Sequence, residues 1–130
     1  MNVMRTAAGG KPEARARLRV AIKYLEVAQL AGTEPGQAVD NVVVGISVLS
    51  GIAAGDVLCL LALGKRYSGT DHAEGVRLLA TVDPDHAKAL ATLVRLKPPA
   101  HYGHSFLNEA DRIKALRAAS VLVVAAQDAR

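Results

Sequence analysis

Apolar residues recur at helical spacing along most of this chain. In residues 13–31, for example, Leu18, Ile22 and Leu25 follow one another at steps of four and three, which places them on one face of a helix. The same spacing predicts further helices over residues 37–65, about 70–82, 84–97 and about 105 or 108–127. No stretch combines strand-like alternation with turn residues. The pattern therefore predicts an all-α fold, a compact bundle of four to five helices that run mostly antiparallel because the loops are short.

Polar residues and prolines mark where several of these helices begin and end. Asp71, followed by Glu74, predicts a capping box at the start of the third helix. Asp83-Pro84 predicts an N-terminal cap and a first helical proline for the fourth helix. Pro98-Pro99 predicts the end of that helix, because proline has no N–H and restricts the residue before it. Residues 97–104 are accordingly expected to form a loop or tight corner.

The second predicted helix contains the most apolar segment, residues 42–64, which is interrupted by a single charged residue, Asp56. A helix this apolar on every side is either the centre of a soluble bundle or a membrane span. A carboxylate near the middle of a span would cost about 2.5–3.5 kcal/mol, and the other predicted helices are amphipathic. We therefore expect a core helix and no membrane interaction.

Asp56 needs a partner if it lies in or near the core. One interpretation is a structural ion pair or a helix N-terminus. The other is that the carboxylate orients a histidine in a functional site. The candidate partners from the sequence are Arg66, His72 and His101.

A row of small residues follows the same helix at steps of four: Ser47, Gly51, Gly55 and Cys59. Small side chains allow another backbone to come close. In a soluble protein the row indicates either a tight helix crossing or the contact surface of a homodimer.

Composition is consistent with one helical domain. A length of 130 residues fits a single domain, and we expect residues 1–12 to form a flexible tail and residues 13–128 to form the bundle. Aromatic residues make up only 3% and there is no Trp, so Ala, Leu and Val must build the core. The single cysteine, Cys59, excludes an internal disulfide. With no apolar signal segment in residues 1–10, a reducing cytoplasm is the expected compartment.

The net charge of +4 is unevenly distributed. Residues 1–23 hold six basic residues and one acidic residue, so the positive excess lies at the N-terminal end. Arg15, Arg19 and Lys23 are spaced by four and would form a stripe on one face of the first helix. The stripe is either a solvated surface or a contact for nucleic acid or another polyanion.

Familiar catalytic motifs are missing from the sequence. It contains no phosphate-binding glycine loop, no dinucleotide fingerprint, no zinc-type Cys/His spacing and no Gly-x-Ser-x-Gly turn. His101 and His104 are close enough to share a metal ion, but no carboxylate is adjacent to them. We therefore expect neither a metal nor a cofactor.

Two arginine–histidine pairs have the same spacing, with five residues between Arg66 and His72 and between Arg95 and His101. Arginine binds phosphate through a bidentate contact, and histidine near neutral pH can take the proton of a ribose 2′-hydroxyl. Together they suffice for cleavage of RNA without metal. The simpler interpretation is that Arg66 is a helix C-terminal charge and that His72 is a surface residue.

Three segments carry a resemblance to a known family. They are Gly51-Ile52-Ala53-Ala54-Gly55-Asp56, Arg66-Tyr67-Ser68-Gly69-Thr70-Asp71-His72 and Leu96-Lys97-Pro98-Pro99-Ala100-His101-Tyr102-Gly103. In this order they resemble an actinobacterial branch of the HEPN superfamily, named for higher-eukaryote and prokaryote nucleotide-binding domains. The resemblance covers about residues 15–126. It implies an all-α bundle that is often a homodimer.

Many HEPN proteins are metal-independent endoribonucleases of toxin–antitoxin, phage-defence or RNA-processing systems, with a composite site at a dimer cleft. By resemblance, Arg95 would hold the phosphate and His101 would act on the proton, with Tyr102 after it. Leu96 stands where the family usually has a polar residue. Arg66 and His72 resemble the signature of the branch itself. The candidate binding residues beside these pairs are Asp56, Asp71, Lys97 and Tyr102.

Three hypotheses follow. The first is an RNA-cleaving or nucleotide-binding protein, which predicts that one Arg–His pair shares a cleft with Asp56. The second is a non-catalytic module that dimerises or binds a partner protein, such as an antitoxin, through the row of small residues. The third is a DNA-contacting protein that uses the Arg15 stripe.

Overall fold

The computed structural model describes residues 4–103 and 106–129, apart from the side chain of Tyr102. The described residues form five helices and two short strands, which confirms the predicted helical bundle. In chain order these elements are β1 (Thr6–Ala8), α1 (Lys11–Ala31), α2 (Ala38–Leu63), β2 (Lys65–Tyr67), α3 (His72–Ala80), α4 (Pro84–Tyr102) and α5 (Glu109–Asp128).

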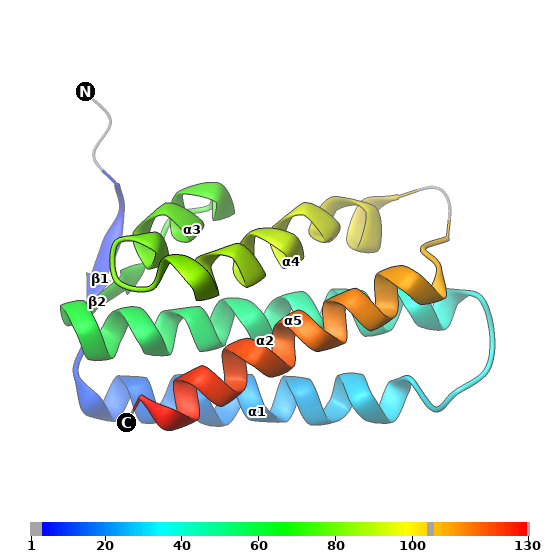
Figure 1. The fold of residues 1–130 in the computed structure, drawn as a ribbon, viewed down its shortest axis with the longest axis horizontal. Helices are drawn as coiled ribbons and strands as arrows, with labels where there is room; N and C mark the ends of the chain where they lie inside the picture. Colours follow the sequence, from blue (N-terminus) through cyan, green and yellow to red (C-terminus); the bar gives the residue numbers. More distant parts are fainter. Residues whose placement is uncertain (1–3, 104–105, 130) are drawn as a thin grey trace.

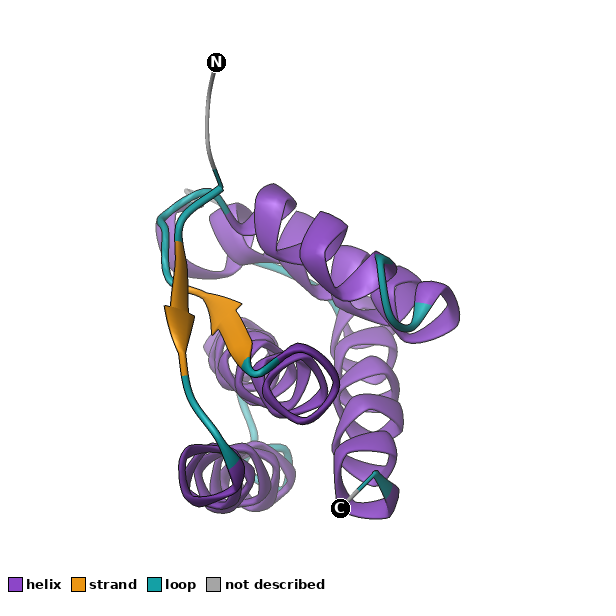
Figure 2. Cartoon of the chain, turned by 90° about the vertical axis from the view of Figure 1, so that its left-hand side faces the viewer, coloured by secondary structure: helices purple, strands orange, loops and turns teal. Residues whose placement is uncertain are grey.

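Helix α2 occupies the centre of the bundle. It packs against α1, α4 and α5, and α5 crosses diagonally in front of it (Figure 1). Viewed along the axes of α1 and α2, α4 covers one side of α2 and α5 covers another (Figure 2). The fully buried side chains include Val43, Val44, Val48 and Val57 of α2, with Leu93 and Leu122 from the covering helices. The core is therefore built of aliphatic residues, as the composition predicts.

By length and composition alone, α2 could cross a membrane, but 67% of its most apolar window is buried inside the bundle. Other helices of the same chain supply that cover. This is the burial of a core helix in a soluble protein, which agrees with the interpretation drawn from Asp56.

The row of small residues on α2 is a helix crossing within the chain. Ser47, Gly51, Gly55 and Cys59 are all buried. A methyl group at Gly51 would collide with Leu93 of α4 and lie 3.2 Å from Leu122 of α5, and one at Gly55 would lie 3.3 Å from Leu90. Because α4 and α5 already cover the row, it is not the contact surface of a homodimer.

The prediction that the chain has no strands was wrong. Gly64 takes a left-handed conformation (φ 70°) and ends α2 at Leu63, two residues earlier than predicted. Residues 65–67 then pair antiparallel with residues 6–8, with Ala7 opposite Arg66. Residues 6–8, which were expected to belong to a flexible tail, therefore hold the segment that contains Arg66 by strand pairing. Strands of three residues are too short to show a period of two in the sequence.

The predicted end of α4 was also wrong, because the helix continues through Pro98 and Pro99 to Tyr102. The Gly103 N–H donates to the carbonyl of Pro99 at 3.2 Å, so the turn after the prolines is still closed. Proline cannot donate to the carbonyl one turn earlier, but it does not forbid the helical φ. Residues 97–102, expected as a loop, are therefore helical, and His104 lies outside the described residues.

Most predicted caps are present. The Asp71 carboxylate accepts from the Ala73 N–H at 3.0 Å, and the Asp83 carboxylate accepts from the His86 N–H at 3.1 Å. The capping box predicted with Glu74 is absent among the described contacts, because the Glu74 carboxylate lies 3.9 Å from the Arg77 guanidinium instead.

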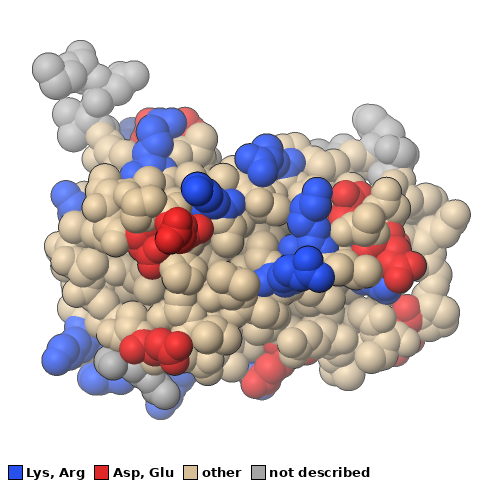
Figure 3. Space-filling view, viewed as in Figure 1, with Lys and Arg blue, Asp and Glu red and all other residues tan. Residues whose placement is uncertain are grey.

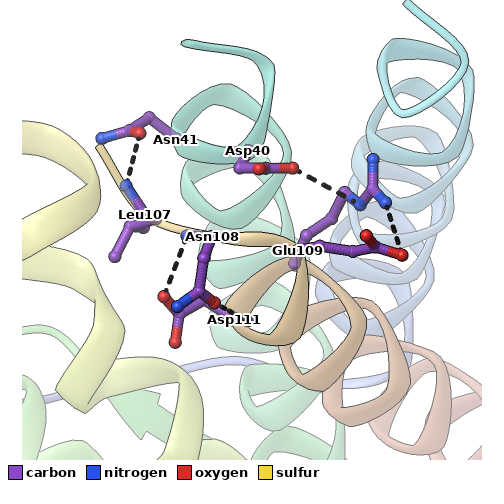
Figure 4. Close-up of polar contacts among 7 residues, drawn as sticks. Asp40, Asn41, Leu107, Asn108, Glu109 and Asp111 are labelled. Carbon is purple, nitrogen blue, oxygen red and sulfur yellow. Dashed lines mark hydrogen bonds and ion pairs between the residues drawn. The ribbon is translucent and has the colours of Figure 1, made fainter. Parts of the chain in front are cut away.

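The start of α5 is fixed to the start of α2 (Figure 4). Asn108 and Asp111 form a reciprocal capping box. The Asn41 side-chain oxygen accepts from the Leu107 N–H at 2.9 Å, and Arg112 lies 3.5 Å from the Asp40 carboxylate. These contacts join the first turns of the two helices, so that α5 is held against α2 at this end.

The close packing at Gly51 gives a test of the core. Gly51→Ala should lower the free energy of unfolding by about 1–2 kcal/mol, because overpacking costs about 1–3 kcal/mol and the helix propensity of alanine offsets up to about 1 kcal/mol. Gly45→Ala is the matched control, since the three atoms nearest to its methyl group, from 3.2 Å, all belong to the exposed side chain of His101. Urea unfolding measures both; equal stability of the two variants would contradict the packing described.

Candidate functional site

A pocket of about 180 Å³ lies where β2 and the turn after it pass beside α2 and α4. It contains three of the residues singled out from the sequence, Asp56, Arg66 and His72. Arg17 from α1 and Tyr67 from β2 complete its polar side. Ile52, Leu90 and Val94 form its apolar side. The structure therefore brings one of the two Arg–His pairs into a shared cleft with Asp56.

The strand pairing and a tyrosine hold the two members of this pair. Arg66 lies in β2, and its Nη1 donates to the Tyr67 carbonyl at 3.2 Å. The Tyr67 hydroxyl accepts from the Asp71 N–H at 2.8 Å, which closes the turn between β2 and α3. A side chain at Gly69 would collide with the Tyr67 ring, so the turn needs glycine there. This turn brings His72, the first residue of α3, back over the pocket.

Asp56 forms an ion pair with Arg17, at 2.9 Å between Oδ2 and Nη2. Only 12% of the Asp56 side chain is exposed. Burial raises the pKa of Asp56 above its usual value of 3.8, while the nearby charges of Arg17 and Arg66 oppose the rise. The structural interpretation of Asp56 is therefore correct, but its ion-pair partner is not one of the three proposed from the sequence. In the sequence, Arg17 was considered only as one of the basic residues of the N-terminal segment.

Of those three proposed partners, Arg66 acts on Asp56 through its charge and His72 lines the same pocket. His101 is elsewhere, because its ring packs over Gly45, eleven residues before Asp56 on α2. That separation corresponds to about 16 Å along a helix.

His72 contacts the ammonium group of Lys97, at 3.1 Å between Nε2 and Nζ. Burial lowers the pKa of His72 below its usual value of 6.5, and the charge of Lys97 lowers it further, against a small opposing effect of Asp71. An ammonium group has only donors, so Nε2 must be the accepting nitrogen and Nδ1 carries the ring proton. His72 is therefore neutral near pH 7 and can accept a proton.

The second pair, Arg95 and His101, does not converge within the chain. The two residues are six apart on a continuous helix, which places them about 120° apart around its axis. Arg95 is exposed and its Nη2 lies 3.5 Å from the Thr92 hydroxyl. His101 instead lines a shallow hollow with Asn41 and Gly45 of α2. The pair favoured by the family resemblance is thus separated, and the side chain of its neighbour Tyr102 lies outside the described residues.

Two other features of the sequence have a plain structural explanation. Cys59 lines the pocket, but burial raises the pKa of its thiol to about 12, so it is not a nucleophile near neutral pH. In the basic stripe, Arg15 and Arg19 are exposed, and Lys23 forms an ion pair with Glu26 at 2.7 Å. An exposed stripe of this kind fits a solvated helix face and a contact for a polyanion equally.

No family model matches the chain, and no curated protein is significantly similar to it. The resemblance to HEPN proteins therefore stays a prediction from the residues, and the pocket has to be interpreted from its own chemistry. Arg17 is paired with Asp56. Arg66 and His72 line the same pocket, and Lys97 contacts the histidine. A guanidinium, an ammonium and a neutral imidazole together can bind a phosphate group and move one proton.

The Arg17–Asp56 ion pair gives a test of the pocket floor. Arg17→Met leaves a buried carboxylate without its ion-pair partner and should lower the free energy of unfolding at pH 7 by about 2 kcal/mol, discounted because Arg17 is partly exposed. The pKa of Asp56 should rise further in the variant, because an opposing charge is removed. The unpaired carboxylate destabilises the folded state only while it is charged, and a group with a raised pKa becomes protonated as the pH falls. The loss of stability caused by Arg17→Met should therefore be smaller at pH 4 than at pH 7.

Urea unfolding at both pH values measures this effect, with Arg19→Met, an exposed arginine of the same helix, as the control. A loss of equal size at the two pH values would show that the ion pair is not its cause.

The contact between Lys97 and His72 gives a second test. Lys97→Met should raise the pKa of His72 part of the way toward 6.5, because one lowering charge is removed while burial remains. NMR titration of the ring protons measures this shift, and Lys88→Met on the same helix is the control. In the unaltered protein the pKa of His72 is lower in the folded state than in the unfolded state, so protonation of His72 favours unfolding. The stability that the neutral histidine contributes is therefore lost as the pH falls below about 6.5. An unchanged His72 pKa in Lys97→Met would contradict the contact.

Proposed function

We propose that the chain binds RNA through a phosphate group in this pocket and cleaves it without a metal ion, as a cytoplasmic endoribonuclease of the toxin–antitoxin or defence type. The observation that carries the proposal is that Arg66 and His72 line one pocket, with His72 kept neutral by burial and by Lys97. The resemblance to HEPN proteins points to the same chemistry.

Each residue has a defined role in the proposed reaction. Arg66 binds the non-bridging oxygens of the scissile phosphate and stabilises the charge that grows on them. The phosphate attracts the Lys97 ammonium, which frees Nε2 of His72. That nitrogen takes the proton of the ribose 2′-hydroxyl, and the 2′-oxygen attacks the phosphorus. The 5′-oxygen leaves and takes a proton from water, so the products are a 2′,3′-cyclic phosphate and a 5′-hydroxyl end.

The pocket suits one phosphate group better than a whole nucleotide. Its volume of about 180 Å³ is small, and its apolar side is formed by short aliphatic residues. The bases of the RNA would therefore stay outside the pocket, and recognition would depend on the backbone more than on the sequence.

A second candidate is a protein that binds a nucleotide or RNA phosphate without cleaving it. The Asp56 carboxylate lines the same pocket and opposes the positive charge of Arg66. It therefore reduces the charge that Arg66 can offer to a transition state, which favours binding over cleavage. Both candidates predict binding that depends on Arg66, and they differ only in whether His72 moves a proton.

The experiment is cleavage of an end-labelled RNA oligonucleotide in the presence of a metal chelator. His72→Gln and Arg66→Gln should each reduce the rate by about a hundredfold or more. His101→Gln and His86→Gln are matched histidine controls outside the pocket and should retain activity. The rate should fall as pH decreases below about 6.5, because the protonated imidazole cannot act as the base.

Binding without cleavage, lost in Arg66→Gln, would support the second candidate. Neither cleavage nor binding would reject both, and equal loss in His72→Gln and His101→Gln would show that the pocket is not the active site.

A further inference from the structure

One face of α5 is apolar and exposed. Ile113, Val121 and Val124 are 45%, 44% and 53% exposed, although the rest of the helix packs on α1, α2 and α4. Their spacing of eight and three residues places them along one side of the helix. Large aliphatic residues gathered on one exposed helix face are typical of a contact surface.

The exposed face of α5 is bordered by hollows. Two hollows of about 630 and 520 Å³ lie beside α5, and Val121 lines both of them. Asp128 lines the first hollow, and Lys114 and Arg117 line the second. The face therefore has an acidic end, an apolar centre at Val121 and a basic end. Figure 3, which views the side on which α5 crosses in front, shows uncharged surface in the middle of this face, with acidic and basic side chains around it.

The charges are placed symmetrically about Val121. Lys114 is seven residues before it and Asp128 is seven residues after it. Seven residues are close to two helical turns, so all three lie on one stripe, with each charge about 10.5 Å from the centre. Within residues 4–103 and 106–129, neither Lys114 nor Asp128 forms an ion pair inside the chain. The two charges are thus available to a partner.

We propose that two copies of the chain associate through α5, in an antiparallel arrangement with the two-fold axis at Val121. In this arrangement Lys114 faces the partner's Asp128, and Asp128 faces the partner's Lys114, while the valines meet at the axis. A two-fold interface requires a surface that is complementary to itself, and opposite charges at equal distances from an apolar centre provide that. An unrelated partner would not require this symmetry.

A stable dimer needs a contact of sufficient area. A specific dimer buries roughly 800 Å² per subunit, which is about a tenth of the 7374 Å² accessible surface of the chain. A helix of the length of α5 is about 30 Å long, and the flank of α4 beside it, with Ala89 and Thr92, widens the contact. None of the residues that line the Arg66–His72 pocket belongs to α5, so this dimer is independent of the proposed function.

The experiment is sedimentation velocity of the whole chain over a range of protein concentrations. The unaltered protein should dimerise. Val121→Asp should raise the dissociation constant at least tenfold, because it places two carboxylates at the axis. Val27→Asp, at a valine 41% exposed on α1, is the matched control and should leave the dimer intact. Circular dichroism checks that each variant is folded.

Charge reversal tests the orientation of the two copies. Lys114→Asp alone and Asp128→Lys alone each place like charges together at two symmetric contacts and should weaken the dimer. The double variant restores opposite charges and should dimerise again. A monomer at every concentration, a dimer unaffected by Val121→Asp, or no recovery in the double variant would each overturn the proposal. A complex of this face with a different protein, in place of the homodimer, would overturn it too.

Discussion

The apolar surface of α2 is the constraint on which the rest of the structure depends. A helix that is apolar on every side must be covered on every side, and here α1, α4 and α5 provide the cover. Gly51 and Gly55 let Leu93 and Leu90 approach closely. The small residues of α2 therefore decide where α4 lies, and α4 brings Lys97 into contact with His72.

Asp56 is the exception in this helix, and it is where the core and the pocket meet. Its burial is unfavourable for the charged carboxylate, as the raised pKa shows, and Arg17 provides the compensating charge. The same carboxylate lies in the pocket with Arg66 and His72. The positive charge available to a ligand is thus set by how completely Arg17 neutralises Asp56, which links a structural ion pair to the proposed chemistry.

The two Arg–His pairs show why equal spacing does not give equal geometry. Between Arg66 and His72 the chain leaves a strand and turns at Gly69, so the two side chains return to one pocket. Between Arg95 and His101 the chain stays helical through two prolines, so the side chains point to different sides. Proline was expected to end α4, but its cost in a helix is finite and packing on α2 can outweigh it.

The sequence by itself determined the helical bundle, the central place of α2 and the caps at Asp71 and Asp83, because apolar periodicity and capping depend on residues close together in the chain. The tertiary structure alone decided the pairing of residues 6–8 with 65–67 and of Arg17 with Asp56. It also decided the contact of Lys97 with His72. These partners are 25 to 61 residues apart. Their meeting depends on how the helices pack around α2, which no local pattern of residues records.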